Sequence, residues 1–88
     1  MPTMTATVGS AVGLHARPAM LIAQAAADFD EEVLLHIEGS DPEDAVDATS
    51  SLMIMTLGAE RGDLVVVTSE DEAAVARIAD LIEQDLDA

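Results

Sequence analysis

The sequence predicts a two-layer α+β fold with its elements in the order β-α-β-β-α-β-α. Four short segments are predicted as strands with one apolar face, and the first of them, Thr3–Val8, alternates polar and apolar side chains. Three other segments repeat apolar residues at helical spacing, so each predicted helix has one apolar stripe. Because the chain has 88 residues and no internal repeat or linker, we expect one domain over residues 1–88.

The first strand and the first helix are predicted on either side of a short loop. The strand is Thr3–Val8, and two glycines mark Gly9–Leu14 as a loop. The helix is predicted over Ala16–Asp28. The apolar face of the strand is Met4, Ala6 and Val8. The core-facing positions of the helix are expected to be Ala19, Ile22, Ala23, Ala26 and Phe29, the last of which should anchor the helix end.

Three further elements are predicted in the middle of the chain. Glu32–Glu38 alternates as a second strand, and the acidic segment Gly39–Asp44 has the composition of a turn. Ala45–Ala48 is a short third strand. Ser50 is expected to cap a short helix that runs to Leu57, where Gly58 ends it.

The last strand and the last helix complete the predicted fold. The strand is Asp63–Thr68, and the helix runs to about Leu86. Ser69 and Glu72 have the spacing of a capping box, which places the start of the helix at Ser69. The apolar stripe of this helix is Ala74, Val75, Ile78, Leu81 and Ile82.

The composition is strongly acidic. Eighteen Asp and Glu residues oppose three arginines, there is no lysine, and the formal net charge is −15. Such a chain repels nucleic acid and anionic lipid surfaces, so neither is expected as a partner. Self-repulsion destabilises a highly charged fold at low ionic strength. We therefore hypothesise that the protein works in a salt-rich cytoplasm, although an ordinary acidic protein would have a similar composition.

Several classes of site and location are disfavoured by the sequence. There is no cysteine, which excludes disulfides and thiolate chemistry. The chain has no nucleotide-binding loop, and its acidic run Asp41–Asp44 lacks the ligand spacing of a calcium-binding EF-hand. We expect no metal and no cofactor. No segment has the pattern of a signal peptide or membrane span, so we expect a cytoplasmic protein without membrane insertion.

The segment Gly13–Ala19, with the sequence Gly-Leu-His-Ala-Arg-Pro-Ala, places a histidine at the start of the first helix. The neutral imidazole of His15 is a nucleophile, and the first N–H groups of a helix attract anions. Arg17 adds a planar set of donors for phosphate oxygens. Pro18 fits the first turn because no N–H is needed there. These residues indicate a phosphoryl group held on His15, with the backbone N–H groups of Ala16 and Arg17 around it.

This segment resembles the active-site motif of the HPr family, the histidine-containing phosphocarriers of the sugar phosphotransferase system. Ser50–Ala59, a serine followed by a helix rich in Met and Leu and closed by Leu-Gly, is similar to the second motif of that family. The resemblance covers essentially the whole chain, apart from an insertion of about four residues near Ser40–Asp44. It implies an open-faced β-sandwich, with a four-stranded antiparallel sheet and helices on one face.

The resemblance implies that His15 accepts a phosphoryl group from phosphoenolpyruvate-charged enzyme I and passes it to an enzyme IIA domain of a sugar transporter. Arg17 is expected to stabilise charge in the transition state. The family uses the Nδ1 atom of the imidazole, a choice that the sequence alone does not make. The expected protein is a monomeric, stoichiometric phosphotransfer intermediate rather than an autonomous enzyme.

The second motif implies two further roles. By resemblance, Ala16, Met20, Leu52 and Met55 form an apolar docking patch beside His15 for both partners. Ser50 matches a position that a regulatory kinase phosphorylates in some relatives, but it also has the simpler role of helix cap. Two departures from the family pattern bear on these roles. Thr49 replaces a frequent lysine, and Val12 replaces a frequent asparagine.

Two alternative functions stay open at the level of sequence. One is a carrier for a dihydroxyacetone kinase or a nitrogen-type regulatory branch, in which the acceptor is kinase-associated. The other is a non-catalytic regulatory module that binds partners through the Leu and Met residues, although the pair His15 and Arg17 argues against it. Arg61 and Arg77 are interpreted as surface residues. His36 is interpreted as a structural residue with no role in the site.

Overall fold

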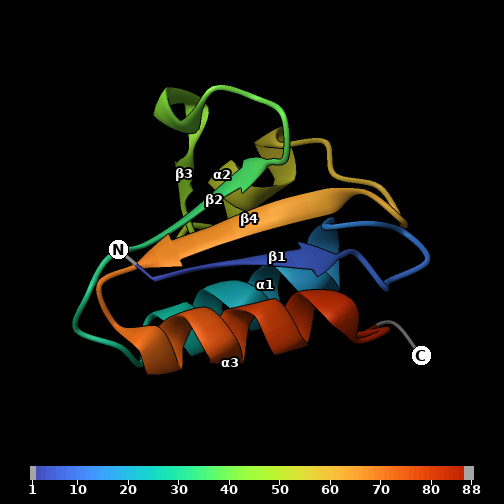
Figure 1. The fold of residues 1–88 in the computed structure, drawn as a ribbon. Helices are drawn as coiled ribbons and strands as arrows, with labels where there is room; N and C mark the ends of the chain where they lie inside the picture. The colour runs from blue at the N-terminus through green and yellow to red at the C-terminus, as the bar shows by residue number, and fades with distance from the viewer. Residues whose placement is uncertain (1, 87–88) are drawn as a thin grey trace.

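The computed structural model describes residues 2–86, and within that range it contains one sheet of four strands in the order β1-β4-β2-β3 (Figure 1). The strands are β1 (Thr3–Thr7), β2 (Val33–Ile37), β3 (Val46–Asp47) and β4 (Leu64–Ser69). All three pairings are antiparallel, with His36 opposite Val66 and Val66 opposite Thr5 in the central rows. The predicted four-stranded antiparallel sheet is confirmed.

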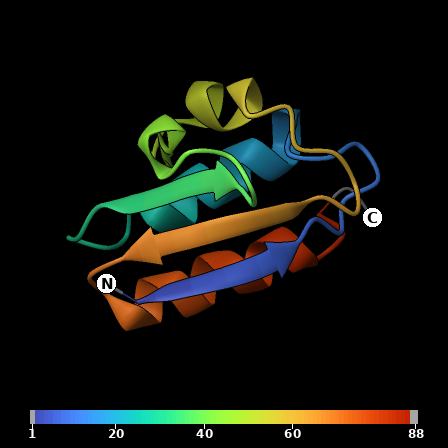
Figure 2. The ribbon, with the colours of Figure 1, turned by 45° about the horizontal axis from the view of Figure 1, so that its top comes forward.

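The helices form a second layer on one face of this sheet. They are α1 (Ala16–Ala26), α2 (Ser51–Thr56) and α3 (Glu72–Glu83). Figures 1 and 2 show α1 and α3 lying side by side against the sheet, and the short α2 packs against α1 and β3. The predicted open-faced α+β sandwich is therefore confirmed, because the opposite face of the sheet has no helix over it among the described elements.

The core lies between the sheet and the two long helices. Alternation in the strands points Ala6, Val33, Leu35, Val65 and Val67 into it, and all five are fully buried. The stripe predicted for the last helix is buried as well, which confirms it. Its members are Ala74, Val75, Ile78, Leu81 and Ile82.

The first helix is shorter than predicted. It ends at Ala26 rather than Asp28, because the N–H groups of Asp28 and Phe29 donate to carbonyls only three residues back, at Ala25 and Ala26. These tighter bonds end the α-helical ladder. Phe29 therefore lies beyond the helix, half-buried against the edge of the core.

The start of the last helix was predicted wrongly. Asp71 is the N-cap of α3, and its carboxylate accepts the N–H groups of Ala73 and Ala74 at 2.9 and 3.3 Å. Ser69 belongs to β4 instead, where it is buried opposite Val33, and its hydroxyl oxygen accepts the N–H of Asp71. Strand pairing thus extends through the residue that the capping-box pattern assigned to the helix.

Other elements differ from their predicted boundaries by a few residues. The helix α3 ends at Glu83 rather than near Leu86, and the predicted loop after β2 contains a short 3-10 helix, η1 (Pro42–Asp44). The side chain of Asp41 caps η1 by accepting the N–H of Glu43 at 2.9 Å. Met4, predicted on the buried face of the first strand, is exposed because β1 is an edge strand.

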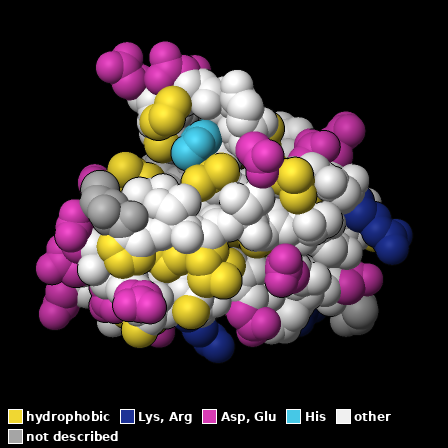
Figure 3. Space-filling model, viewed as in Figure 1, with side chains coloured by type: hydrophobic (Ala, Val, Ile, Leu, Met, Phe, Trp, Pro, Cys, Tyr) yellow, Lys and Arg dark blue, Asp and Glu magenta, His cyan; other side chains and the backbone are white. Residues whose placement is uncertain are grey.

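The open face of the sheet is mostly uncharged. Figure 3 shows apolar side chains gathered over the strands on this face, with acidic side chains around its margin. Leu34, Leu64 and Val66 are the large apolar residues that point outward here, and His36 lies among them, half-buried on β2. Within residues 2–86, no helix is both long enough and apolar enough to cross a membrane.

Candidate functional site

His15 lies at the junction of the loop and α1. It is the N-cap residue of the helix, with an extended backbone (φ −111°, ψ 167°), and its side chain makes no capping hydrogen bond. The residue is exposed to solvent. A histidine in this position has its imidazole available for chemistry, since the helix does not use the ring to satisfy its own N–H groups.

The first turn of α1 leaves backbone donors unused beside His15. The N–H groups of Ala16 and Arg17 have no partner within the helix, and Pro18 has no N–H at all. The first amide to pair is that of Ala19, which donates to the carbonyl of His15 at 3.3 Å. Two free donors at the positive end of the helix dipole therefore lie next to the imidazole.

Ala16 has an unusual backbone conformation. Its φ is +35°, which makes it the one residue other than glycine with a positive φ in the described range. A side chain in the left-handed region costs roughly 1–2 kcal/mol. Such strain persists only where the surrounding structure imposes it, and it concentrates at functional sites.

The loop before His15 is held by the segment that follows α2. The N–H of Leu14 donates to the carbonyl of Ala59 at 3.0 Å, and the Leu14 side chain is buried. Gly13 has φ +74°, and a Cβ at this position would collide with the Ala59 carbonyl oxygen. Only glycine allows this close approach. The position of His15 thus depends on a contact between the two sequence motifs.

Ser10 links the same loop to the end of the chain. Its buried hydroxyl donates to the carbonyl of Gln84 at 3.2 Å and accepts the N–H of Leu86 at 3.1 Å. The N–H of Gly9 also donates to the carbonyl of Ile82 at 3.0 Å. These bonds fix the start of the loop against α3, as the Ala59 contact fixes its end.

The short helix α2 lies beside α1, close to this loop. Ser50 is its N-cap, and the hydroxyl oxygen accepts the N–H of Met53 at 3.2 Å, which confirms the predicted cap. Of the residues expected in the docking patch, Ala16, Met20 and Leu52 are exposed, whereas Met55 is half-buried against the core. The neighbouring Met53 is the more exposed of the two methionines.

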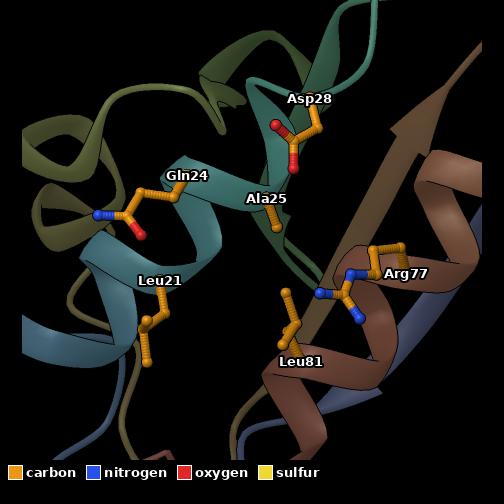
Figure 4. Close-up of a pocket in the computed structure, with 6 residues that line it drawn as sticks. All are labelled: Leu21, Gln24, Ala25, Asp28, Arg77 and Leu81. Carbon is orange, nitrogen blue, oxygen red and sulfur yellow. The ribbon is translucent and has the colours of Figure 1, made fainter.

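One hollow lies apart from His15. It has a volume of about 400 Å³ and runs between α1 and α3, lined by Leu21, Gln24, Ala25, Asp28, Arg77 and Leu81. Figure 4 shows Arg77 reaching toward α1 from α3, with Asp28 and Gln24 on the opposite wall. Arg61 and Arg77 are both exposed, as predicted. No three His, Asp or Glu side chains among residues 2–86 are grouped so that they could hold a metal ion.

The structure thus places His15, Ala16 and Arg17 together at one helix start, with Met20 and Leu52 on the two adjacent helices. Sequence reasoning missed the supporting residues Gly13, Ser10 and Ala59. Gly13 carried a signal, since a glycine directly before a functional segment often marks a close backbone approach. Ala59 carried none, because its role lies in its carbonyl.

The sequence that forms this site is similar to known proteins over nearly its whole length. A family model described as the PTS HPr component phosphorylation site matches residues 2–84. Phosphocarrier protein HPr of Streptomyces coelicolor is 37% identical over 83 residues, which cover 91% of this chain and 86% of that protein.

Solved structures give the same result. HPr-C-His from Thermoanaerobacter tengcongensis superposes with a TM-score of 0.85 at 32% identity, covering 100% of this chain and 98% of that one. HPr from Bacillus anthracis superposes with a TM-score of 0.79 at 29% identity, covering 91% of this chain and 94% of that one.

Proposed function

Because this chain belongs to the HPr phosphocarrier family of the phosphotransferase system, we propose that it carries a phosphoryl group on His15 between two cytoplasmic partners. The donor is phosphoenolpyruvate-charged enzyme I, and the acceptor is an enzyme IIA domain of a sugar transporter. The single observation that best supports this proposal is the exposed imidazole of His15 beside two unpaired helix N–H groups.

The proposed step is an in-line transfer between two nitrogen atoms. The unprotonated nitrogen of the His15 imidazole attacks the phosphorus atom, the new N–P bond forms, and the bond to the donor breaks with its electron pair returning to the donor. In the transfer to the acceptor the roles are exchanged. A nitrogen of the acceptor attacks the phosphorus atom, and the N–P bond to His15 breaks with its electron pair returning to the imidazole. The phosphoryl group stays reactive throughout, because the imidazole of a phosphohistidine is a good leaving group once its other ring nitrogen is protonated, so that it leaves as neutral imidazole.

The surroundings of His15 favour the charged phosphoryl group. The N–H groups of Ala16 and Arg17 donate toward its oxygens, and the positive end of the α1 dipole adds to their effect. The Arg17 guanidinium is on the same exposed turn, where it can reach the equatorial oxygens as charge develops.

Transfer of label from radioactive phosphoenolpyruvate through the cognate enzyme I, in KCl-rich buffer, tests this proposal. Wild type should acquire an acid-labile, base-stable label, and His15→Ala should acquire none. The matched control is His36→Ala, which removes the other histidine and should be labelled as wild type is.

The opposite result has a clear meaning. If folded wild type stays unlabelled while enzyme I phosphorylates itself, the carrier function is wrong and a non-catalytic regulatory module is favoured. Label on wild type that an enzyme IIA domain cannot remove, but a dihydroxyacetone kinase subunit can, would redirect the acceptor to the kinase-associated branch.

A further inference from the structure

The hollow between α1 and α3 has the dimensions of a small-molecule site. Its volume is about 400 Å³, and sites for small ligands span roughly 300–1,000 Å³. Its lining comes from one face of α1, including the turn just past its end, and from one face of α3, because the spacings are those of helix neighbours. The six lining residues are Leu21, Gln24, Ala25, Asp28, Arg77 and Leu81.

Apolar side chains form one part of this lining. Ala25 and Leu81 are buried at the edge of the core, and Leu21 is half-buried. Ala25 is small, so it leaves space between the helices that a larger side chain would fill. An aliphatic group placed in the hollow would lose its contact with water against these three side chains, which favours its binding.

Two opposite charges form another part of the lining, and they do not pair with each other. Arg77 reaches toward α1 from α3, and Asp28 lies on the opposite wall (Figure 4). Within residues 2–86, no ion pair or side-chain hydrogen bond joins either of them to another residue. The acid one turn along α3 from Arg77 is Asp80, and its carboxylate accepts an N–H of the Gln84 side chain at 2.9 Å.

An unpaired arginine is unexpected in this chain, which has 18 acids and only three arginines. The guanidinium of Arg77 is therefore available to an anionic group, and the carboxylate of Asp28 to a cationic one. Gln24, exposed on the same wall as Asp28, adds an amide that both donates and accepts hydrogen bonds.

The two charges together select the class of ligand. A simple anion would be repelled by Asp28 and by the net charge of −15, and a simple cation would leave Arg77 without a partner. A molecule with both an ammonium and a carboxylate group satisfies both side chains. Because it has no net charge, the field of the acidic chain does not oppose its approach.

We propose that the hollow between α1 and α3 binds a zwitterionic amino acid with an aliphatic side chain. The carboxylate of the ligand lies at Arg77 and its ammonium group at Asp28, and the aliphatic side chain packs on the apolar part of the lining. This site goes beyond the proposed function and does not rest on it, since no residue of the phosphate site lines the hollow.

Three compounds that share one isobutyl group test the proposal. Leucine carries both charges, isocaproate only the carboxylate, and isopentylamine only the ammonium group. Each is titrated into the full chain at a fixed KCl concentration, and the backbone amide signals are followed by NMR. Leucine should give saturable shifts in residues 21–28 and 77–81. Each analogue should bind about tenfold more weakly, because one charge-assisted hydrogen bond is lost.

Two variants assign the charges of the ligand to their partners. Arg77→Gln and Asp28→Asn should each weaken leucine binding by about tenfold. Arg77→Gln should not weaken the binding of isopentylamine, and Asp28→Asn should not weaken that of isocaproate. The matched controls are Arg61→Gln and Asp44→Asn, which remove the same charges at exposed positions outside the hollow. They should bind leucine as wild type does, and thermal unfolding shows that each variant is folded.

Several results would overturn the proposal. Leucine might give no saturable shift up to its solubility limit, or shifts outside the two helices, and either result would mean that the hollow is not a site for it. Isocaproate or isopentylamine binding as tightly as leucine would show that only one of the two charges is recognised. Leucine binding that Arg77→Gln and Asp28→Asn leave unchanged would show apolar contact alone. Because no phosphoryl transfer is measured, failure of the carrier function leaves this test intact.

Discussion

The N–H of Leu14 donates to the carbonyl of Ala59 at 3.0 Å, and this bond joins the loop before His15 to the residue that follows the turn at the end of α2. The bond connects the two sequence motifs through their backbones. The bond requires that the backbone next to Leu14 approach Ala59 very closely. Gly13 makes that approach possible, because a Cβ there would collide with the same carbonyl oxygen.

Gly13→Ala should therefore destabilise the fold by about 2–3 kcal/mol, through both the collision and the positive φ of +74°. The matched control is Gly39→Ala. Gly39 also has a positive φ, of +91°, but a Cβ there meets nothing within 4 Å. The control should lose only about 1 kcal/mol, from backbone strain alone. Urea denaturation measures both, and equal losses would mean that the approach to Ala59 carries no cost.

Ala16→Gly should stabilise the fold. The positive φ of +35° costs alanine roughly 1–2 kcal/mol, whereas glycine adopts it freely. Glycine in turn costs about 0.5–1 kcal/mol through its more flexible unfolded chain, so the net gain is about 0.5–1 kcal/mol.

The control for this prediction is Ala19→Gly, three residues further along α1, where the helix geometry is ordinary and the side chain is buried. It should lose about 1 kcal/mol or more. If denaturant titration shows that Ala16→Gly is destabilised as much as Ala19→Gly, the strain at Ala16 is absent in solution.

The order of elements could be predicted because each strand and helix buries one face. The apolar residues of each element therefore recur along the sequence with the period of a strand or of a helix. The start of α3 could not be predicted in this way. Ser69 and Asp71 both precede the helix with good capping chemistry, and the choice between them depends on whether β4 pairs with β2 as far as Ser69. That pairing is a long-range event, so it leaves no mark on the residues around Ser69.

The candidate site also contains residues that the sequence predicts and residues that it does not. His15, Arg17 and Pro18 are recognisable because their side chains suit phosphate chemistry at a helix start. The support of the loop comes from Ser10 and Ala59, which act through contacts with distant backbone, at Gln84, Leu86 and Leu14. No local pattern encodes those partners, and the identity of Ala59 hardly matters for a bond to its carbonyl.

Ser50 provides a test that separates capping from regulation. Ser50→Ala removes the acceptor for the N–H of Met53 and should cost about 1 kcal/mol of stability. Ser50→Asp keeps a capping oxygen and should retain nearly full stability, because aspartate caps as well as serine. However, it places a carboxylate at the start of α2, two residues before the exposed Leu52, so it should slow transfer from enzyme I.

The control is Ser51→Ala, which changes the neighbouring serine at the first helical position rather than the cap. It should affect neither stability nor transfer appreciably. Thermal unfolding and the labelling assay together measure all three variants. A Ser50→Ala variant as stable as Ser51→Ala would contradict the capping role, and unimpaired transfer by Ser50→Asp would count against regulation through charge at this position.

The acidic surface leads to a prediction about salt. With a formal net charge of −15 and 18 acids against three arginines, the folded chain repels itself at low ionic strength. Added KCl screens this repulsion, so the midpoint of thermal unfolding should rise steeply from low salt and continue upward toward molar KCl. A midpoint that does not change with KCl would contradict the hypothesis of a salt-rich cytoplasm.

A double variant identifies the cause of this salt effect. Glu43→Gln with Asp44→Asn removes two negative charges from the exposed η1 segment while keeping the Asp41 cap. If repulsion is responsible, this variant should be more stable than wild type at low salt and indistinguishable from it near 1 M KCl, where the Debye length is about 3 Å. A matched variant of neutral surface residues, Thr5→Ser with Thr7→Ser, should keep the wild-type salt dependence. An equal stability difference at both salt concentrations would instead point to local effects of the substitutions, because screening acts only on charge.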